Sequence, residues 1–176
     1  EAFCALDHAS LIWEQGHSIA IMGESGSGKS TLARLMIGLE RPSEGRVLIN
    51  DIDTTKWGLR EWRKYRGKIQ AVFQDAGGTL NPAWSTSKNV EEALVNLTDL
   101  SSTQRKSRIA ELMGQTGLKK SLLDTPVRKL SGGEQRRLAL LRSLSISPEF
   151  LILDEVTAGL DLISTEAVLQ LLEKYE

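Results

Sequence analysis

The sequence predicts an α/β fold in which a helical lobe interrupts a core of strands and helices. Three observations support this prediction. An apolar strand, a glycine-rich loop and a helix follow one another between residues 18 and 37, a fully apolar strand occupies Phe150–Leu153, and the stretch between them has helical periodicity. With 40% hydrophobic and 26% charged residues among 176, the composition is that of an ordinary globular protein. No apolar run has the ~20 residues that span a bilayer.

Apolar runs and turn residues indicate the individual elements. In chain order we expect short β structure at 10–13, a buried strand at 18–22, a helix at 31–37, a strand at 46–50, a short helix at 59–65 and a strand at 69–73. Helical patterns then run from 87 to about 113 and from 131 to 144. The strand at 150–153 reads as the centre of a parallel sheet, and an amphipathic helix at 164–175 closes the chain.

The loop between the first buried strand and its helix carries the most specific pattern. It fits G-x-x-x-x-G-K-[ST], with Gly23, Glu24, Ser25, Gly26, Ser27, Gly28, Lys29, Ser30 and Thr31 in order. Glycines let the backbone N–H groups point at a phosphate chain, Lys29 supplies a cation for the β- and γ-phosphates, and the Ser30 hydroxyl suits Mg²⁺. A plain Gly/Ser surface turn is the alternative, but the strand before and the helix after favour phosphate binding. The sequence therefore predicts a nucleoside triphosphate site.

Two acids follow the second apolar strand. Asp154 lies at the tip of Phe150–Leu153, where ligands of open α/β sheets bind and where a carboxylate is needed beside the Ser30 hydroxyl to hold Mg²⁺. Glu155, one residue further, is placed to polarise a water for attack on the γ-phosphate. An acid that merely caps the next helix is the alternative, and the phosphate loop in the same chain favours the catalytic interpretation.

Leu130–Gln135 forms a second candidate anion site. Ser131, Gly132 and Gly133 precede a helix, so they combine a hydroxyl, backbone N–H groups and the helix dipole. A plain N-cap by Ser131 is the alternative, although a cap needs only the serine and glycines are costly in a first turn. Two phosphate loops with one set of acids suggest two nucleotides shared between two copies.

With these motifs in this order, the sequence resembles the ATP-binding cassette family, the nucleotide-binding domains of ABC transporters, over essentially its whole length. Gly23–Thr31 matches the Walker A loop, Phe150–Glu155 the Walker B strand and Leu130–Gln135 the signature motif. Gln74 matches the Q-loop glutamine. Asp161 matches the D-loop aspartate, whereas Gly159 departs from the usual pattern.

The resemblance implies ATP and Mg²⁺ as cofactors and ATP hydrolysis as the reaction. It implies that Ser30, Gln74 and Asp154 hold Mg²⁺ and that Glu155 is the general base, assisted by Gln74. The ATP of an opposing subunit would be contacted by the signature residues, which are Ser131, Gly132, Gly133 and Glu134. The implied partners are a second cassette, identical or different, membrane-spanning permeases and, indirectly, a solute-binding protein, at the cytoplasmic face of the membrane.

Within the family, Val72–Asp75 and Thr79–Pro82 are similar to the dipeptide, oligopeptide and nickel importer branch, while residues 76–78 depart from it. We expect the permease interface around Gln74 to Trp84. The resemblance further implies one cassette domain over 1–176, truncated at both ends, because a switch-loop histidine and the usual adenine-stacking aromatic are not found; Phe3 is the alternative candidate for that aromatic. Residues 1–81 and 148–176 would form its α/β core, with a small antiparallel β portion, and 82–147 its helical lobe.

Other cassette proteins are the alternatives. DNA-repair and chromosome ATPases insert a long coiled coil, which this sequence lacks, and translation-associated members carry two cassettes. A degenerate regulatory cassette that binds ATP without turnover is opposed by Lys29, Asp154 and Glu155 and favoured by the missing histidine. The basic stretch at 60–68 reads as a solvated helix, and the net charge of −1 gives no argument for nucleic acid as a partner.

Overall fold

The computed structural model describes residues 4–73, 76–156, 165–166, 168–169 and 172. In chain order its helices and strands are α1 (Lys29–Met36), β1 (Leu48–Ile49), β2 (Ile52–Asp53), α2 (Leu59–Tyr65), β3 (Ile69–Val72), α3 (Thr86–Leu97), α4 (Ser102–Gln115), α5 (Gly132–Ser145) and β4 (Phe150–Leu153). Short 3-10 turns lie at Ala76–Thr79, Lys120–Leu122 and Val127–Lys129. Gln74, Asp161 and most of the predicted closing helix lie outside the described residues.

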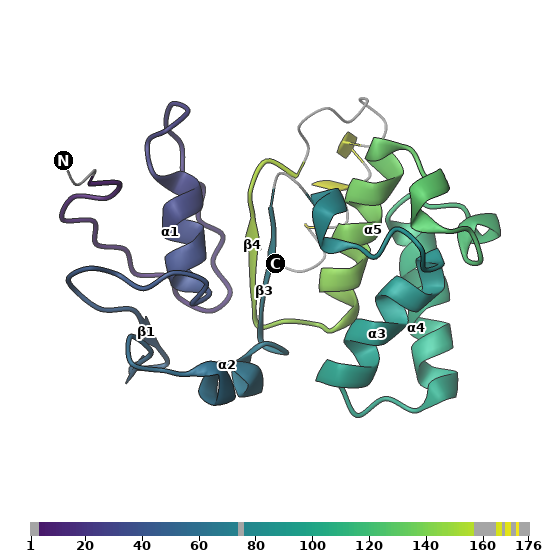
Figure 1. Ribbon diagram of the computed structural model, residues 1–176, viewed down its shortest axis with the longest axis horizontal. Coiled ribbons are helices and arrows are strands. Elements are labelled where there is room, and N and C mark those ends of the chain that lie inside the picture. The colour runs from purple at the N-terminus through teal and green to yellow at the C-terminus, as the bar shows by residue number, and fades with distance from the viewer. Residues whose placement is uncertain (1–3, 74–75, 157–164, 167, 170–171, 173–176) are drawn as a thin grey trace.

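A parallel pair of strands stands at the middle of the molecule (Figure 1). β3 pairs with β4 from Ile69 opposite Phe150 to Val72 opposite Leu153. The two faces of the pair serve two different cores. Phe150 and Ile152 pack with the small core of Ile37, Trp62 and Ile69, whereas Leu151 and Leu153 pack with the larger helical core. Because successive side chains of a strand point to opposite faces, this double role explains why β4 is apolar throughout.

The prediction that β4 lies at the centre of a sheet is wrong for the described residues. There β4 pairs with β3 alone, and all four of its residues are only half buried. The predicted strand at 18–22 is also not formed, and its side chains are exposed, Met22 at 91%. Residues on either side of this stretch do contact the two ends of β4. The Trp13 ring lies 5.2 Å from the Phe150 ring, and the Ser30 hydroxyl donates to Asp154, directly after the strand.

Hydrophobicity alone does not make a strand, since a strand exists through ladder hydrogen bonds to a neighbour. The short β structure expected at 10–13 is absent for the same reason, although the turn after it is formed by a His17 N–H to Glu14 carbonyl bond of 3.3 Å. The strand expected at 46–50 is shorter, Leu48–Ile49, and pairs with Ile52–Asp53 in an antiparallel hairpin. That hairpin is the small antiparallel portion that the sequence led us to expect.

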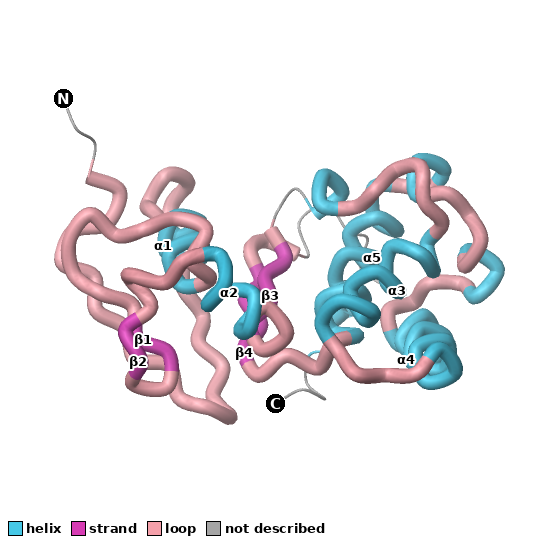
Figure 2. The backbone as a smooth tube through the Cα atoms, turned by 60° about the horizontal axis from the view of Figure 1, so that its bottom comes forward, coloured by secondary structure: helices cyan, strands magenta, loops and turns pink. Residues whose placement is uncertain are grey.

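Helices α3, α4 and α5 pack together on one side of the β3–β4 pair, and α1 lies on the other side (Figures 1 and 2). We call α3, α4 and α5 with their connections the helical region. Its core contains completely buried leucines, among them Leu94, Leu112 and Leu141. None of the helices in the described part of the chain has the length and apolarity needed to cross a membrane.

The helical region owes its boundaries to serine caps. Ser85, Ser101 and Ser131 each accept a hydrogen bond from a backbone N–H of the first turn of α3, α4 and α5. The predicted helical stretch from 87 to 113 is therefore two helices. The first ends where the Thr98 hydroxyl donates to the Leu94 carbonyl oxygen at 2.6 Å, and the second begins at the Ser101 cap.

Candidate nucleotide-binding site

Two glycines of the loop before α1 have a left-handed backbone conformation. Gly26 and Gly28 have φ of 82° and 90°, which only glycine adopts without strain. Gly28 is also tightly covered, because a Cβ there would lie 2.4 Å from the Ala5 carbonyl oxygen and 2.9 Å from a methyl carbon of Leu6. The N-terminal segment thus packs over the loop, a contact that no pattern in the sequence indicated.

Helix α1 begins at Lys29, directly after this turn. Its first backbone bond runs from the Leu32 N–H to the Gly28 carbonyl oxygen at 2.8 Å, and Gly28 has no side chain to cap the helix. The first N–H groups of a helix lack intrahelical acceptors and carry the positive end of its dipole. With no acid in its first turn, α1 presents an N-terminus suited to a phosphate group.

Lys29 closes the loop on itself. Its ammonium group donates to the carbonyl oxygens of Gly23 at 2.7 Å and Glu24 at 2.8 Å. These acceptors are neutral, so a phosphate oxygen, which is charged, makes a stronger bond with the same donor. The Lys29 ammonium group therefore lies over the loop, where it can exchange these carbonyl acceptors for the oxygens of a phosphate chain.

Ser30 and Asp154 meet although 124 positions separate them in the sequence. The Ser30 hydroxyl donates to a carboxylate oxygen of Asp154 at 2.6 Å. Asp154 is fixed at the end of β4 by its backbone N–H, which donates to the Val72 carbonyl oxygen at 2.8 Å. One carboxylate and one hydroxyl fit Mg²⁺, which in phosphate sites takes one or two protein oxygens and fills its octahedron with water and phosphate. No larger cluster of metal-ligating side chains occurs among the residues the structure describes.

Glu155 follows immediately and is exposed to solvent. Its backbone has φ of 52°, a left-handed conformation uncommon for a side chain of this size. Its side chain belongs to neither apolar core. A carboxylate there has access to water beside the Ser30–Asp154 pair.

The signature motif lies on α5, across the β3–β4 pair from α1 (Figure 1). Ser131 is the N-cap of α5, as the simpler of the two interpretations expected. A carboxylate oxygen of Glu134 accepts from both the N–H and the hydroxyl of Ser131 at 2.8 Å, and these bonds lower the pKa of Glu134. A Cβ on Gly132 would meet no atom within 4 Å, so packing within this chain does not require glycine there.

The site predicted from the sequence is therefore placed in part. The structure brings together the phosphate loop, Ser30 and Asp154, and it sets the signature apart from them. Gln74 and Asp161 lie outside the described residues, and the roles of all the predicted site residues stay predictions.

The chain is similar to known proteins over most of its length. The family profile described as ABC transporter matches residues 6–158. The nickel import ATP-binding protein NikE of Brucella abortus (strain 2308) is 38% identical over 171 residues, which are 97% of this chain and 64% of that protein. NikE of Rhodospirillum rubrum is 37% identical over 168 residues, 96% and 61% of the two chains. This chain thus spans less than two thirds of these relatives.

Solved structures agree with these relatives. The dimeric post-hydrolysis state of the ATP-binding cassette MJ0796, bound to ADP and Pi, has a TM-score of 0.90 and 35% identity, over 97% of this chain and 74% of that one. The structure of cbiO1 from Clostridium perfringens, part of the ABC transporter complex cbiONQ, has a TM-score of 0.72 and 34% identity, over 87% and 59%. The α/β fold with an inserted helical lobe is that of ABC ATPase cassettes. This chain belongs to the ABC transporter family.

Proposed function

We propose that this chain binds and hydrolyses ATP as the energy-supplying subunit of an importer. The observation that carries the proposal is the bond between the Ser30 hydroxyl and Asp154, because it joins the phosphate loop to the acidic strand tip across 124 positions of sequence. Two motifs that share a site in space, and not only an order in the sequence, are what phosphoryl transfer requires.

In this proposal the residues divide the work by their chemistry. The N–H groups from Gly26 to Ser30 and the Lys29 ammonium bind the β- and γ-phosphates, once Lys29 exchanges its two carbonyl acceptors for phosphate oxygens. Ser30, Asp154 and, from the sequence, Gln74 would hold Mg²⁺, which supplies positive charge against the phosphates. Glu155 orients a water towards the γ-phosphate and accepts its proton.

The signature would complete the site of a second cassette. Ser131 and Glu134 stand at the N-terminus of α5, and the open space at Gly132 lets another molecule approach the backbone closely. The structural neighbour MJ0796 is dimeric with ADP and Pi. We infer a head-to-tail pair, in which each ATP contacts Walker A of one copy and residues 131–134 of the other. Asp161 would lie in the same interface.

Nickel is the solute that the comparisons favour, since the relatives are nickel import proteins; peptide transport was the other expectation of the sequence. We propose permeases as partners, contacting the chain around Gln74 to Trp84, with a solute-binding protein acting indirectly. The core would comprise 1–81 and 148–176 and the moving lobe 82–147. Such a subunit works at the cytoplasmic face of the membrane.

Replacing Lys29 by alanine tests the nucleotide site. We expect Lys29→Ala to reduce the affinity for Mg·ATP more than tenfold, because a charged donor to phosphate is lost. The melting temperature should stay unchanged, since the lysine contacts only two carbonyl groups of its own loop. Lys64→Ala, which removes an exposed lysine on α2, is the matched control and should bind normally. Calorimetric titration giving wild-type affinity in a folded Lys29→Ala protein would contradict the proposal.

Pairing needs its own test. Ser131→Arg should leave the ATP affinity of the single chain intact and abolish ATP-dependent pairing, because the long cation fills the space that a second nucleotide needs. Light scattering of the Glu155→Gln protein with and without Ser131→Arg measures this. A dimer that forms equally well with arginine at position 131 would overturn the sandwich arrangement.

A further inference from the structure

The chain between β3 and α3 contacts α5, the helix that begins at the signature motif, at several points. We call residues 76–84 the β3–α3 connection. Near its start, Gly77 approaches α5 so closely that a Cβ there would lie 2.8 Å from the Gln135 side-chain oxygen. Leu80 is 5% exposed and belongs to the same core as Leu138 and Leu141 of α5. Figure 1 shows the first turn of the connection beside α5.

Arg142 makes the polar part of this attachment. One of its terminal nitrogens donates to a carboxylate oxygen of Glu92 on α3 at 2.7 Å, and the other to the Thr79 carbonyl oxygen at 3.3 Å. The pair is partly buried, with side-chain exposures of 31% for Arg142 and 37% for Glu92. Because the guanidinium is planar and forked, the ion pair with Glu92 fixes the direction of the nitrogen that reaches Thr79.

The far end of the connection is fastened as well. Asn89 of α3, 3% exposed, accepts from the Asn81 N–H at 2.8 Å and donates to the Asn81 carbonyl oxygen at 3.1 Å. The Trp84 carbonyl oxygen accepts from the N–H of Val127, in the turn that leads into Ser131. These bonds tie the connection to α3, to α5 and to the turn before the signature, so its backbone is held at both ends.

We infer that Arg142 is a positioning residue for ATP hydrolysis: with Glu92 it fixes the β3–α3 connection on α5, so that the connection and Ser131 move as one body. This rests on the proposed function, in which Trp84 lies in the permease interface and Ser131 contacts the second ATP. Force applied at Trp84 then reaches Ser131 through packed side chains and hydrogen bonds. The hydrogen bonds of Arg142 go to Thr79 and Glu92, neither of which is assigned to the nucleotide site, so Arg142 acts through the placement of others.

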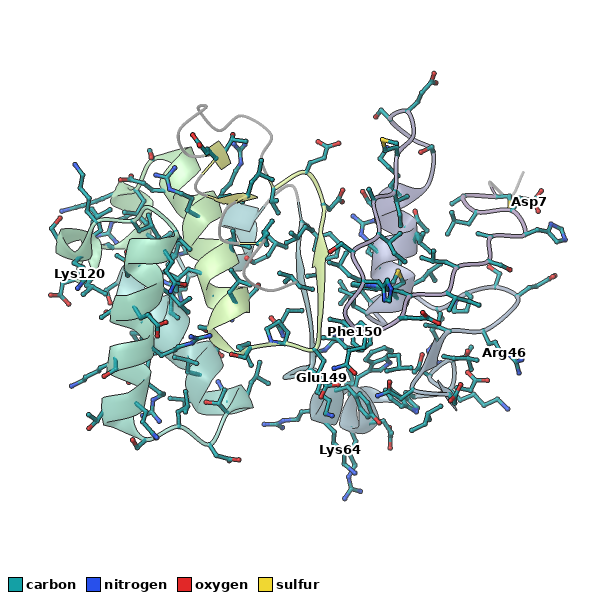
Figure 3. The ribbon with its side chains drawn as sticks, turned by 180° about the vertical axis from the view of Figure 1, so that it is seen from behind. Asp7, Arg46, Lys64, Lys120, Glu149 and Phe150 are labelled. Carbon is teal, nitrogen blue, oxygen red and sulfur yellow. The ribbon has the colours of Figure 1, made fainter. Side chains whose placement is uncertain are left out.

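Variants of this pair separate positioning from stability. Arg142→Lys keeps a positive charge for Glu92 but cannot hold a second nitrogen on the Thr79 carbonyl. Arg142→Gln and Glu92→Gln remove the ion pair. Glu149→Gln is the matched control, because Lys68–Glu149 is also a 2.7 Å pair but joins the residues directly before β3 and β4, away from the connection. Figure 3 shows Glu149 beside Phe150, the first residue of β4.

Hydrogen exchange of the full-length protein tests the attachment without any partner. We expect faster exchange in residues 76–84 for Arg142→Lys and Arg142→Gln, and wild-type exchange there for Glu149→Gln. Exchange that is unchanged in all variants would overturn the attachment, whether or not the protein proves to be a transporter subunit.

Turnover of the complete assembly tests the positioning. Coupling along such networks predicts that kcat falls roughly 2- to 30-fold in the Arg142 and Glu92 variants, while KM for ATP and the melting temperature of Arg142→Lys stay at wild-type values. A raised KM with normal kcat would overturn the inference, as would full turnover despite faster exchange. An assembly whose wild-type protein hydrolyses no ATP would instead overturn the proposed function and leave the exchange result standing.

Discussion

The N-terminal region, residues 4–73, and the helical region bury their apolar side chains to very different extents. Every large side chain with less than 2% exposure lies at position 86 or later among the described residues. The exposed large apolar side chains lie mostly in the N-terminal region, namely Leu11, Ile12, Ile19, Ile21, Met22, Leu39, Leu48, Ile52 and Leu59. The nucleotide loop thus belongs to the less buried half of the molecule.

This difference follows from how the two regions make their contacts. The helical region closes its core with neighbouring helices, whose hydrogen bonds are local and whose ends are capped by Ser85, Ser101 and Ser131. The N-terminal region depends on partners distant in the sequence, such as Asp154 for Ser30 and Phe150 for Trp13. Apolar burial is therefore concentrated in the helical region, whereas the candidate phosphate loop lies in the N-terminal region and depends on Asp154 beyond it. Four predictions test that division.

The largest effect is expected at Glu155. Glu155→Gln keeps the shape and hydrogen-bonding capacity of the side chain but cannot accept a proton, so turnover should fall about 10²- to 10⁴-fold. Because Glu155 is exposed and packs in neither core, ATP affinity and melting temperature should remain unchanged. Single-turnover hydrolysis in the complete assembly is the measurement, and a variant that retains near-normal turnover would move the general base elsewhere.

Truncating a leucine or an isoleucine compares the two regions directly. Leu141 is 0% exposed, so Leu141→Ala should cost about 2–5 kcal/mol of unfolding free energy through lost burial and a cavity. Ile21 is 46% exposed, so Ile21→Ala should change it by less than about 0.5 kcal/mol. Denaturant unfolding measures both. Equal losses would mean that residues 18–22 are buried in solution.

Substituting Gly28 tests how far the loop depends on the N-terminal segment that packs over it, at Ala5 and Leu6. Gly28→Ala introduces left-handed strain and a Cβ that overlaps the Ala5 carbonyl oxygen, so we expect a loss of about 1–3 kcal/mol and weaker Mg·ATP binding. Gly45→Ala is the matched control, because Gly45 has φ of 79° with no atom within 4 Å of its added Cβ. Calorimetric titration and thermal unfolding should separate the two, and similar losses would show that only backbone strain matters.

The smallest effect concerns the cap of the signature helix and its pH dependence. The pKa of Glu134 is lowered from 4.5 chiefly by the Ser131 N–H, so its contribution to stability is present above 4.5 and disappears as the pH falls through the lower folded value. The difference in melting temperature between wild type and Glu134→Gln should therefore be constant from pH 7 to about 5.5 and shrink below 4.5.

The α4 cap provides the control for this measurement. Ser101 and Gln104 form the same two reciprocal bonds between side chain and backbone N–H, with a side chain that does not titrate and without the extra hydroxyl-to-carboxylate bond of Ser131. The difference between wild type and Gln104→Ala should therefore stay constant over the same pH range. If the two differences vary with pH in parallel, the dependence does not arise from Glu134.

Local patterns predicted those elements whose hydrogen bonds are local. The short helix expected at 59–65 is α2, and the helix expected at 131–144 is α5 with its cap at Ser131. The strands at 69–72 and 150–153 were also predicted, because their apolar runs face two cores at once. The stretch at 18–22 has a similar composition and forms no strand, since pairing is not encoded within a single segment.

By itself the sequence determined the membership of the chain in its family. It also predicted the residues that would meet phosphate, because glycines, Lys29, Ser30 and the two acids have the chemistry that phosphate and Mg²⁺ require. Only the tertiary structure decided which of these residues meet. It placed Ser30 against Asp154, folded Lys29 back on its loop and fastened Thr79 to Arg142. These contacts join segments far apart in the chain, and their geometry depends on the packing of every element between them.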